Sequence, residues 1–277
     1  MGLGGYLTWT AAAREISLRL PEDVKIFPCE GFVYNRKTLV SSPIFDNNPN
    51  FFLKGRDEKA FPMFLDNPAT NYCERDTLDR AFHRSDKHII ENICQFYNIE
   101  NPTLKCDLFL TEEEQQKAIS LSEKLDDVFV VIEPSSKTNY TPNRSYPFEK
   151  WQEVVDGLKN HIQVVQLGLD SSRLLNNVTD YRGRTSFRVA SGLIGEASLL
   201  LSSEGGLTHA ATAVNTTALV IITGYQSSKM VAYPQNINID IGKHGPCGLK
   251  GKCTECEQDA KDHDKNEIIN KVLEFLV

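Results

Sequence analysis

The chain has 277 residues, 40% of them hydrophobic and 24% charged, an ordinary composition for a globular protein of one large or two modest domains. Its net charge of −7 argues against non-specific binding to nucleic acid. Its apolar runs fall short of the roughly 20 residues that span a bilayer, and no secretory signal opens the sequence. Seven cysteines, an odd number, indicate no disulfide framework, so we expect a cytoplasmic protein.

The first half of the chain predicts one helix near its start and few regular elements after it. Residues 2–5 are rich in glycine and open a helical pattern that runs to about Leu18. Such a turn normally follows a β-strand, and we expect that strand to be absent or to lie upstream of Met1. The other expected elements are short strands at 24–27 and 107–110, helices at 86–97 and from Thr111 to about Leu125, and an irregular stretch at 54–80.

The second half alternates apolar strands with amphipathic helices, which predicts a parallel sheet covered on both faces. The expected strands are 128–132, 162–167, 198–201 and 218–223, and the expected helices are 148–158, 186–194 and 265–277. Each strand is followed by glycine, serine or a polar loop. Such loops meet at the carboxyl edge of a parallel sheet, where open α/β sheets bind ligands.

The segment 197–213 is the strongest candidate for a ligand site. Its apolar strand is broken by small residues, and a helix-compatible run follows. This arrangement points backbone N–H groups and a helix N-terminus at one spot, which suits a phosphate. We expect Gly205 and Gly206 to allow positive φ and a close ligand, and His209 to reach the same anion. The alternative is a helix N-terminus that is only solvated.

A long loop between the first strand and the first helix of this half carries basic and hydroxyl side chains. They include Ser135, Ser136, Lys137 and Arg144. An arginine beside a glycine turn can bind a diphosphate through two parallel hydrogen bonds, so the loop is a candidate diphosphate clamp. On composition alone, a solvated loop with incidental charges is the alternative.

Three stretches of the sequence resemble glycosyltransferase family nine, the heptosyltransferase-like enzymes. They are Gly2-Leu-Gly-Gly-Tyr-Leu-Thr-Trp-Thr-Ala, Ile132-Glu-Pro-Ser-Ser-Lys with Asn143-Arg-Ser-Tyr-Pro-Phe-Glu-Lys-Trp, and Ser202-Ser-Glu-Gly-Gly-Leu-Thr-His-Ala-Ala. They are similar to the family's Gly-x-Gly-Asp first turn, to the opening of its donor domain and to its Asp-Ser/Thr-Gly-x-x-His block. The similarity covers most of 126–230 and is weaker in the first half.

The resemblance implies an α/β fold of the GT-B type, with two Rossmann-like domains whose parallel sheets face each other across a cleft. The expected domains are an acceptor-side domain over 1–126, which lacks a first strand, and a nucleotide-sugar domain over 127–262. The final helix, 263–277, is expected to return to the first domain. The resemblance further implies an inverting, metal-independent transfer from a nucleotide sugar.

The same resemblance implies where the donor binds. The resemblance and the loops at the strand ends together give the expected donor-binding residues. They are Ser135, Ser136, Lys137, Arg144, Gly168, Asp170, Glu204, Gly205, Gly206, Thr208, His209 and Tyr225. One departure concerns catalysis, because Gly5 stands where the family has an Asp that is a candidate general base. Glycine cannot accept a proton, and loss of a general base typically costs about 10²–10⁴ in rate. We therefore also expect weak or absent transfer.

Three cysteines close together raise the question of a metal. Cys247, Cys253 and Cys256 could hold zinc or iron with a fourth ligand, but their spacing matches no closed four-ligand signature. We therefore expect no metal, and interpret the segment as a thiol-rich loop or a local disulfide. His83 and His88 have no partners at metal-ligand spacing either.

The leading hypothesis is a bacterial glycosyltransferase of cell-surface glycan assembly, such as lipopolysaccharide biosynthesis. The alternatives are an inactive nucleotide-sugar-binding relative and a sugar-nucleotide epimerase of related fold. The expected partners are an ADP-, GDP- or UDP-linked sugar and a glycan or lipid-linked acceptor. We expect no required cofactor, no nucleic acid and no membrane span, with peripheral membrane contact left open. The donor base, the acceptor and the oligomeric state are not predicted.

Overall fold

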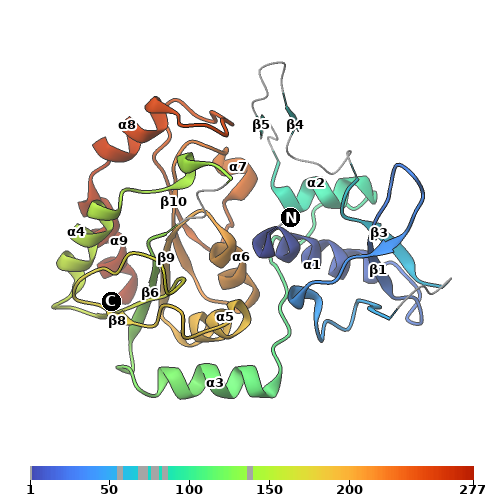
Figure 1. Cartoon of the computed structure of the whole chain (residues 1–277), viewed down its shortest axis with the longest axis horizontal. Helices are drawn as coiled ribbons and strands as arrows, with labels where there is room; N and C mark the ends of the chain where they lie inside the picture. The colour runs from blue at the N-terminus through green and yellow to red at the C-terminus, as the bar shows by residue number, and fades with distance from the viewer. Residues whose placement is uncertain (1, 55–58, 68–73, 76–80, 83–86, 136–139) are drawn as a thin grey trace.

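The computed structural model describes residues 2–54, 59–67, 74–75, 81–82, 87–135 and 140–277 (Figure 1). Within these residues a six-stranded sheet with helices on both faces stands beside a smaller three-stranded sheet. Helix α1 (Leu3–Ser17) lies between them, in contact with α6 (Gly206–Ala213) of the larger unit.

The larger sheet confirms the predicted parallel architecture. Its strand order is β11-β10-β9-β6-β7-β8, and every neighbouring pair is parallel. The strands are β6 (Phe129–Glu133), β7 (Gln163–Gln166), β8 (Thr179–Asp180), β9 (Leu199–Ser203), β10 (Ala218–Ile222) and β11 (Ile237–Asp240). The two edge strands, β8 and β11, were not predicted, because one has only two residues and both mix polar with apolar side chains.

Side chains of the central strands alternate between two apolar clusters. Val130 and Ile132 of β6 join Trp151 in one cluster, whereas Val131 joins the opposite cluster. Helices α4 (Phe148–Leu158) and α9 (Lys265–Leu276) cover the first face, and α5 (Phe187–Glu196) and α6 cover the second (Figure 1). This alternation is the period-2 pattern of a sheet buried on both faces.

The remaining helices and the smaller sheet complete the described fold. The smaller sheet has the order β2-β1-β3, with β1 parallel to β3 and antiparallel to β2. Its strands are β1 (Ile26–Glu30), β2 (Thr38–Leu39) and β3 (Phe61–Phe64), and a separate pair joins β4 (Glu74–Arg75) to β5 (Ala81–Phe82). The other elements are α2 (Ile89–Phe96), α3 (Glu112–Ser122), α7 (Ser228–Val231), α8 (Thr254–Asp262) and the 3₁₀ turns η1 (Pro43–Phe45) and η3 (Pro142–Arg144).

Several predicted elements of the first half shift or disappear. The strand expected at 24–27 is β1 at 26–30, and the stretch at 54–80, expected to be irregular, contains β3. The helix expected at 86–97 begins only after His88, whose ring caps α2. Thr111 caps α3 through the predicted capping box with Glu114.

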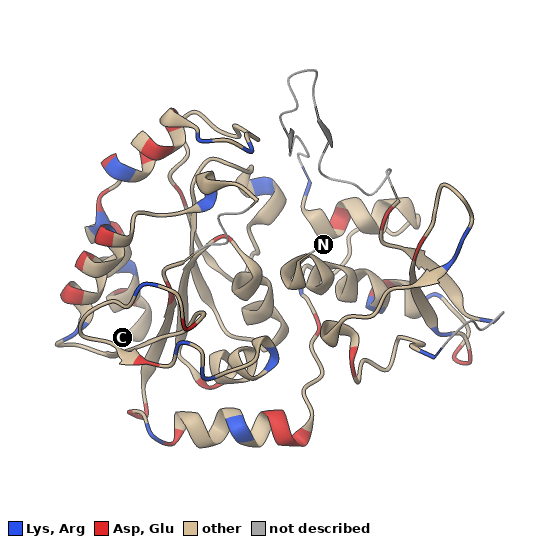
Figure 2. Cartoon of the chain, in the orientation of Figure 1, with Lys and Arg blue, Asp and Glu red and all other residues tan. Residues whose placement is uncertain are grey.

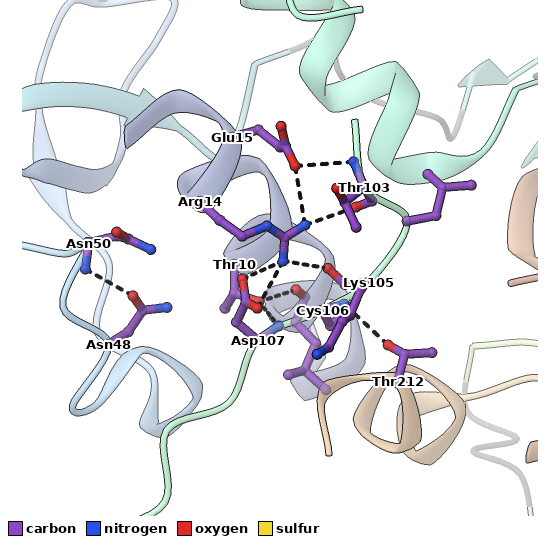
Figure 3. A network of polar contacts seen from close by, with 12 residues as sticks. Thr10, Arg14, Glu15, Asn48, Asn50, Thr103, Lys105, Cys106, Asp107 and Thr212 are labelled. Carbon is purple, nitrogen blue, oxygen red and sulfur yellow. Dashed lines mark hydrogen bonds and ion pairs between the residues drawn. The ribbon is translucent and has the colours of Figure 1, made fainter. Parts of the chain in front are cut away.

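The strand expected at 107–110 is wrong, because this segment is held by side chains rather than by a neighbouring strand. Arg14 of α1 donates to the carbonyls of Thr103 and Lys105 and pairs with Asp107 at 2.7 Å (Figure 3). The Cys106 N–H donates to the Thr212 hydroxyl of α6 at 3.2 Å. The segment is therefore an extended connection bonded to α1 on one side and to α6 on the other.

The contact between α1 and α6 is apolar and very close. One continuous core cluster runs from β1 through α1 to α6 and the sheet, and α6 carries no charged residue while α1 carries its charges only near its end (Figure 2). A Cβ added to Gly4 would lie 2.7 Å from the Gly206 Cα, closer than real Cβ atoms approach other atoms. Glycine at position 4 therefore allows the two helices to meet backbone to backbone.

The last helix does not return to the first domain as expected. Helix α9 packs on α4, where a Cβ added to Gly157 would lie 2.5 Å from the Ile269 Cδ1, and its Ile268 and Val272 are buried in the cluster under α4. The apolar face that the sequence predicts for this helix is therefore covered by α4 and the six-stranded sheet.

The domain boundary expected at 126 falls between α3 and β6. It stays a prediction, since α3 packs on α5 of the second half.

Candidate functional site

The β9–α6 turn has the predicted strand, turn and helix, but its glycines serve a different purpose. Gly205 has a φ of −179°, which is extended backbone that any residue adopts, and positive φ is recorded for neither glycine. The Thr208 hydroxyl donates to the Gly205 carbonyl at 2.6 Å and accepts the Gly205 N–H at 3.3 Å. Gly206 is the partner of Gly4 in the helix contact, so the packing of α1 explains why this residue is small.

Arg144 reaches this turn from the loop after β6. Its Nε and Nη2 donate to the two carboxylate oxygens of Glu204, in a bidentate pair. Glu204 is only 6% exposed, and the N-terminus of α6 follows directly after it. The sequence predicts that Arg144 clamps a diphosphate. The structure places the guanidinium at that turn, with a carboxylate on the face that a phosphate would use.

The ring of His209, expected to reach an anion at this turn, is buried and in hydrogen-bond contact with Tyr233. The residue is 6% exposed, and its Nδ1 lies 2.7 Å from the Tyr233 hydroxyl. Burial, together with the charge of Arg144, lowers the pKa of His209 to about 3, so the ring is neutral at pH 7. It therefore adds no positive charge to the turn.

A buried polar cluster surrounds Tyr233 behind the turn. The ring of His88 packs edge-on at 4.6 Å between centroids, and the Cys106 Sγ lies 3.3 Å from the Tyr233 hydroxyl. Burial and the neighbouring His209 lower the pKa of His88 to about 3, and burial raises that of Tyr233 well above its ordinary value. The sequence signals nothing here, because these residues come from four separate segments.

The other predicted donor residues lie at the same edge of the sheet but in different surroundings. Gly168 and Asp170 follow β7, two strands away from β9, and both pack against the segment 172–183. Tyr225 follows β10 with its ring buried edge-on against Tyr140, 6.1 Å between centroids. Ser135 is half-buried at the end of the described loop. Ser136 and Lys137 lie outside the described residues, as does His83.

Gly5 lies in the first turn of α1, next to the glycine that touches α6. The first turn and the phosphate-suited turn are therefore neighbours, as the GT-B arrangement requires. No side chain stands at position 5 to accept a proton.

Glu133 is an ionisable group that the sequence reasoning missed. It ends β6 and is in register with Ser202 of β9, at the same carboxyl edge. Burial raises its pKa to about 7. A single acidic residue directly after four apolar strand residues is the signal that could have found it.

A polar depression lies elsewhere on the larger unit, away from the β9–α6 turn. This depression of about 520 Å³ is lined by Asp126, Lys159, His161, Gln163 and Thr179, among others, at the amino ends of β7 and β8. Ligands of open α/β sheets bind at the carboxyl ends of strands, so this depression is not our candidate site.

The fold and the site define a class: an α/β enzyme of two facing units, with an anion-suited helix N-terminus and an arginine at the carboxyl edge of the larger sheet. The family model of glycosyltransferase family 9 (heptosyltransferase) matches residues 79–259. The chain belongs to this family and is a glycosyltransferase. No curated protein is significantly similar to it in sequence.

Solved structures of the family share the fold across the whole chain. A glycosyl transferase of family 9 from Veillonella parvula has a TM-score of 0.69 and 12% identity, covering 100% of this chain and 94% of that one. The Escherichia coli ADP-heptose lipopolysaccharide heptosyltransferase II has a TM-score of 0.64 and 13% identity, covering 99% and 96%. The iron-containing dodecameric glycosyltransferase TibC of enterotoxigenic E. coli has a TM-score of 0.67 and 17% identity. The match covers 100% of this chain and 75% of that one. They confirm the GT-B fold expected from the sequence.

None of the described helices combines the length and the apolar character needed to cross a bilayer.

Proposed function

We propose that the chain transfers a sugar from a nucleotide-diphosphate donor to a glycan or glycoconjugate acceptor, with the donor diphosphate at the β9–α6 turn. One observation carries this placement: the loop after β6 brings the Arg144 guanidinium to the carboxylate that directly precedes the N-terminus of α6. The Arg144 guanidinium and the N-terminus of α6 therefore meet at the stretch that resembles the family's Asp-Ser/Thr-Gly-x-x-His block.

The donor class follows from the family. A similar structure is the ADP-heptose lipopolysaccharide heptosyltransferase II, and TibC has been solved in complex with ADP-D-β-D-heptose. We take ADP-heptose as the first donor to test, with GDP- and UDP-linked sugars beside it. Lipopolysaccharide core is the corresponding acceptor, in a bacterial cytoplasm.

The proposed chemistry is a single displacement. The acceptor hydroxyl attacks the anomeric carbon and loses its proton to solvent, the bond to the diphosphate oxygen breaks, and the configuration at that carbon inverts. Negative charge grows on the leaving nucleoside diphosphate, where Arg144 and the N–H groups of α6 stabilise it. Protein groups thus stabilise the negative charge of the leaving group, as a transfer without a metal ion requires.

For a diphosphate to bind Arg144, the Glu204 carboxylate must release or share the guanidinium. Its carboxylate and a diphosphate would compete for the same two donors of Arg144. Binding of the donor therefore separates the Arg144–Glu204 pair or shares the guanidinium between them. The cost lowers donor affinity relative to a site with an unpaired arginine.

A nucleotide-sugar-binding relative with weak or no transfer is the second candidate, and Gly5 favours it. The acceptor hydroxyl must lose a proton, and no carboxylate is available at position 5 to take it. Membership of family 9 favours transfer over the epimerase alternative, which needs no acceptor.

The test is a transfer assay on the wild type and on Gly5→Asp. Each protein is incubated with a nucleotide sugar and lipopolysaccharide core, with and without EDTA, and nucleoside diphosphate release and product mass are followed. We expect acceptor-dependent product, unaffected by EDTA, at a rate about 10²–10⁴ lower for the wild type than for Gly5→Asp. NMR of the product gives its anomeric configuration.

Two results would contradict this proposal. Product formed from the nucleotide sugar without an acceptor would indicate an epimerase. Binding of donor with no product from either protein would leave only the second candidate.

A further inference from the structure

The thiol-rich loop that the sequence reasoning set aside is folded so that its three sulfur atoms meet. The Sγ atoms of Cys247, Cys253 and Cys256 all lie within 4.8 Å of one another. Each is a free thiol; Cys253 and Cys256 are buried and Cys247 is half-buried. Within the described part of the chain, this is the group of three or more Cys, His, Asp or Glu residues that could hold a metal ion.

The distances fit a thiolate-bound ion. Sulfur ligands at about 2.3 Å from a tetrahedral ion lie about 3.8 Å from one another, so three sulfurs within 4.8 Å need little movement to bind one. Sequence spacing could not show this, because five residues separate Cys247 from the Cys253-x-x-Cys256 pair. The structure brings the two parts together by folding the loop at 247–253 back on α8.

Two of the three sulfur ligands stand at the start of a helix. Cys253 caps the N-terminus of α8 and Cys256 lies in its first turn, where the helix dipole stabilises negative charge. Three ligands leave the fourth position of a tetrahedral ion for a solvent molecule.

The same loop holds two loops of the candidate donor site. The Asn143 side chain donates to the carbonyls of Leu249 and Gly251, at 2.9 and 2.7 Å, and accepts from the Cys253 N–H at 2.8 Å. The Cys247 N–H donates to the Gly224 carbonyl at 2.9 Å. Asn143 directly precedes Arg144, and Gly224 follows β10. The loop at 247–253 is thus hydrogen-bonded to the residues that position the site.

We propose that Cys247, Cys253 and Cys256 bind one thiophilic metal ion, zinc or iron, and that this ion fixes the loop against Asn143 and Gly224. Thiolate ligands select these ions over magnesium or calcium. Metal binding here would hold whether or not the chain transfers sugar, so its failure and that of the proposed function are separable.

The experiment is metal analysis of protein purified with reductant and without chelator. We expect about one zinc or iron ion per chain in the wild type, and less than one-tenth of that in Cys247→Ala and Cys253→Ala. Cys29→Ala and Cys94→Ala, which change buried cysteines outside the cluster, are the matched controls and should keep the full content.

A second measurement covers variants that fail to fold. The reduced wild type, stripped of metal, is titrated with Zn²⁺ and with Fe²⁺ while its thermal unfolding and the hydrogen exchange of the Cys253 amide are followed. We expect saturation at one ion per chain, a higher unfolding temperature and slower exchange. Absence of metal in the purified wild type together with no uptake by the reduced chain would overturn the proposal, as would a metal content equal in cluster and control variants.

Discussion

At the scale of single residues, His88 and His209 are neutral rings held in a buried cluster around Tyr233. Burial lowers the pKa of each to about 3, below the unfolded value of 6.5. The unfolded chain therefore binds more protons between these values, and the stability that the neutral rings provide is present above pH 6.5 and lost as the pH falls toward 3.

We therefore predict that unfolding free energy decreases by about 2 kcal/mol per histidine between pH 6.5 and pH 5. Chemical denaturation across this range measures it. His88→Gln and His209→Gln should each flatten the slope, and the exposed His161→Gln should not. A slope that is the same in all four proteins would show that these rings do not titrate as the structure indicates.

Glu133 contributes with the opposite sign over part of the same range. Its pKa is raised to about 7, so the folded chain binds the extra proton and the associated stability is lost as the pH rises from about 4.5 to 7. Comparison among histidine variants removes this contribution, since Glu133 is common to all of them.

At the scale of elements, the backbone contact of α1 with α6 fixes how the two units of the fold meet. In a helix interior, Gly→Ala normally stabilises by about 0.5–1 kcal/mol. At Gly4 the added Cβ would lie 2.7 Å from the Gly206 Cα, and backbone cannot move aside as a side chain can.

We predict that Gly4→Ala destabilises the protein by about 1–3 kcal/mol, the usual cost of overpacking. Gly195→Ala in α5 is the matched control, because its nearest contact would be an ordinary 3.4 Å to the Val214 Cβ, and it should stabilise. Urea denaturation of both variants gives the comparison. A stabilising Gly4→Ala would mean that α1 does not pack on α6 as closely as described.

Arg188 shows how a buried side chain joins elements that the sequence keeps far apart. Its guanidinium pairs with Glu114 of α3 at 2.7 Å and donates to the carbonyls of Pro43 and Phe109. Loops of the first half are therefore attached to α5 of the second. This contact and the Arg14 network of Figure 3 both fix segments of the first half in position, where the described sheet is small.

At the scale of the whole molecule, the larger sheet was predictable and the smaller one was not. Strands such as 218–222 are continuous apolar runs bounded by polar loops, a pattern that local sequence alone determines. In the described part of the first half, three of the five strands have only two residues, and segments such as 101–110 are fixed by distant side chains. The hydrophobic periodicity of the sequence does not indicate such contacts between distant residues.

Parts of the candidate site could likewise be predicted from the sequence, and other parts could not. The β9–α6 turn and Arg144 could be predicted, because turn chemistry and the family resemblance both mark them. Glu204 as the partner of Arg144, the burial of His209 and the meeting of the three thiols depend on tertiary packing, and the structure was needed to find them.

We expect a nucleotide diphosphate to bind at the β9–α6 turn beside Arg144. Isothermal titration calorimetry with ADP and ADP-heptose, and with GDP and UDP as alternatives, tests it most directly. We predict saturable binding of one nucleotide by the wild type and a loss of about 10- to 100-fold in affinity in Arg144→Ala, the cost of one charge-assisted bidentate contact.

Glu204→Gln should bind the same nucleotide more tightly, because it releases Arg144 from a competing carboxylate. Arg173→Ala, which removes an exposed ion pair with Glu149, is the control and should leave affinity unchanged. Binding that is equal in the wild type and Arg144→Ala, or no binding of any nucleotide tested, would contradict the account.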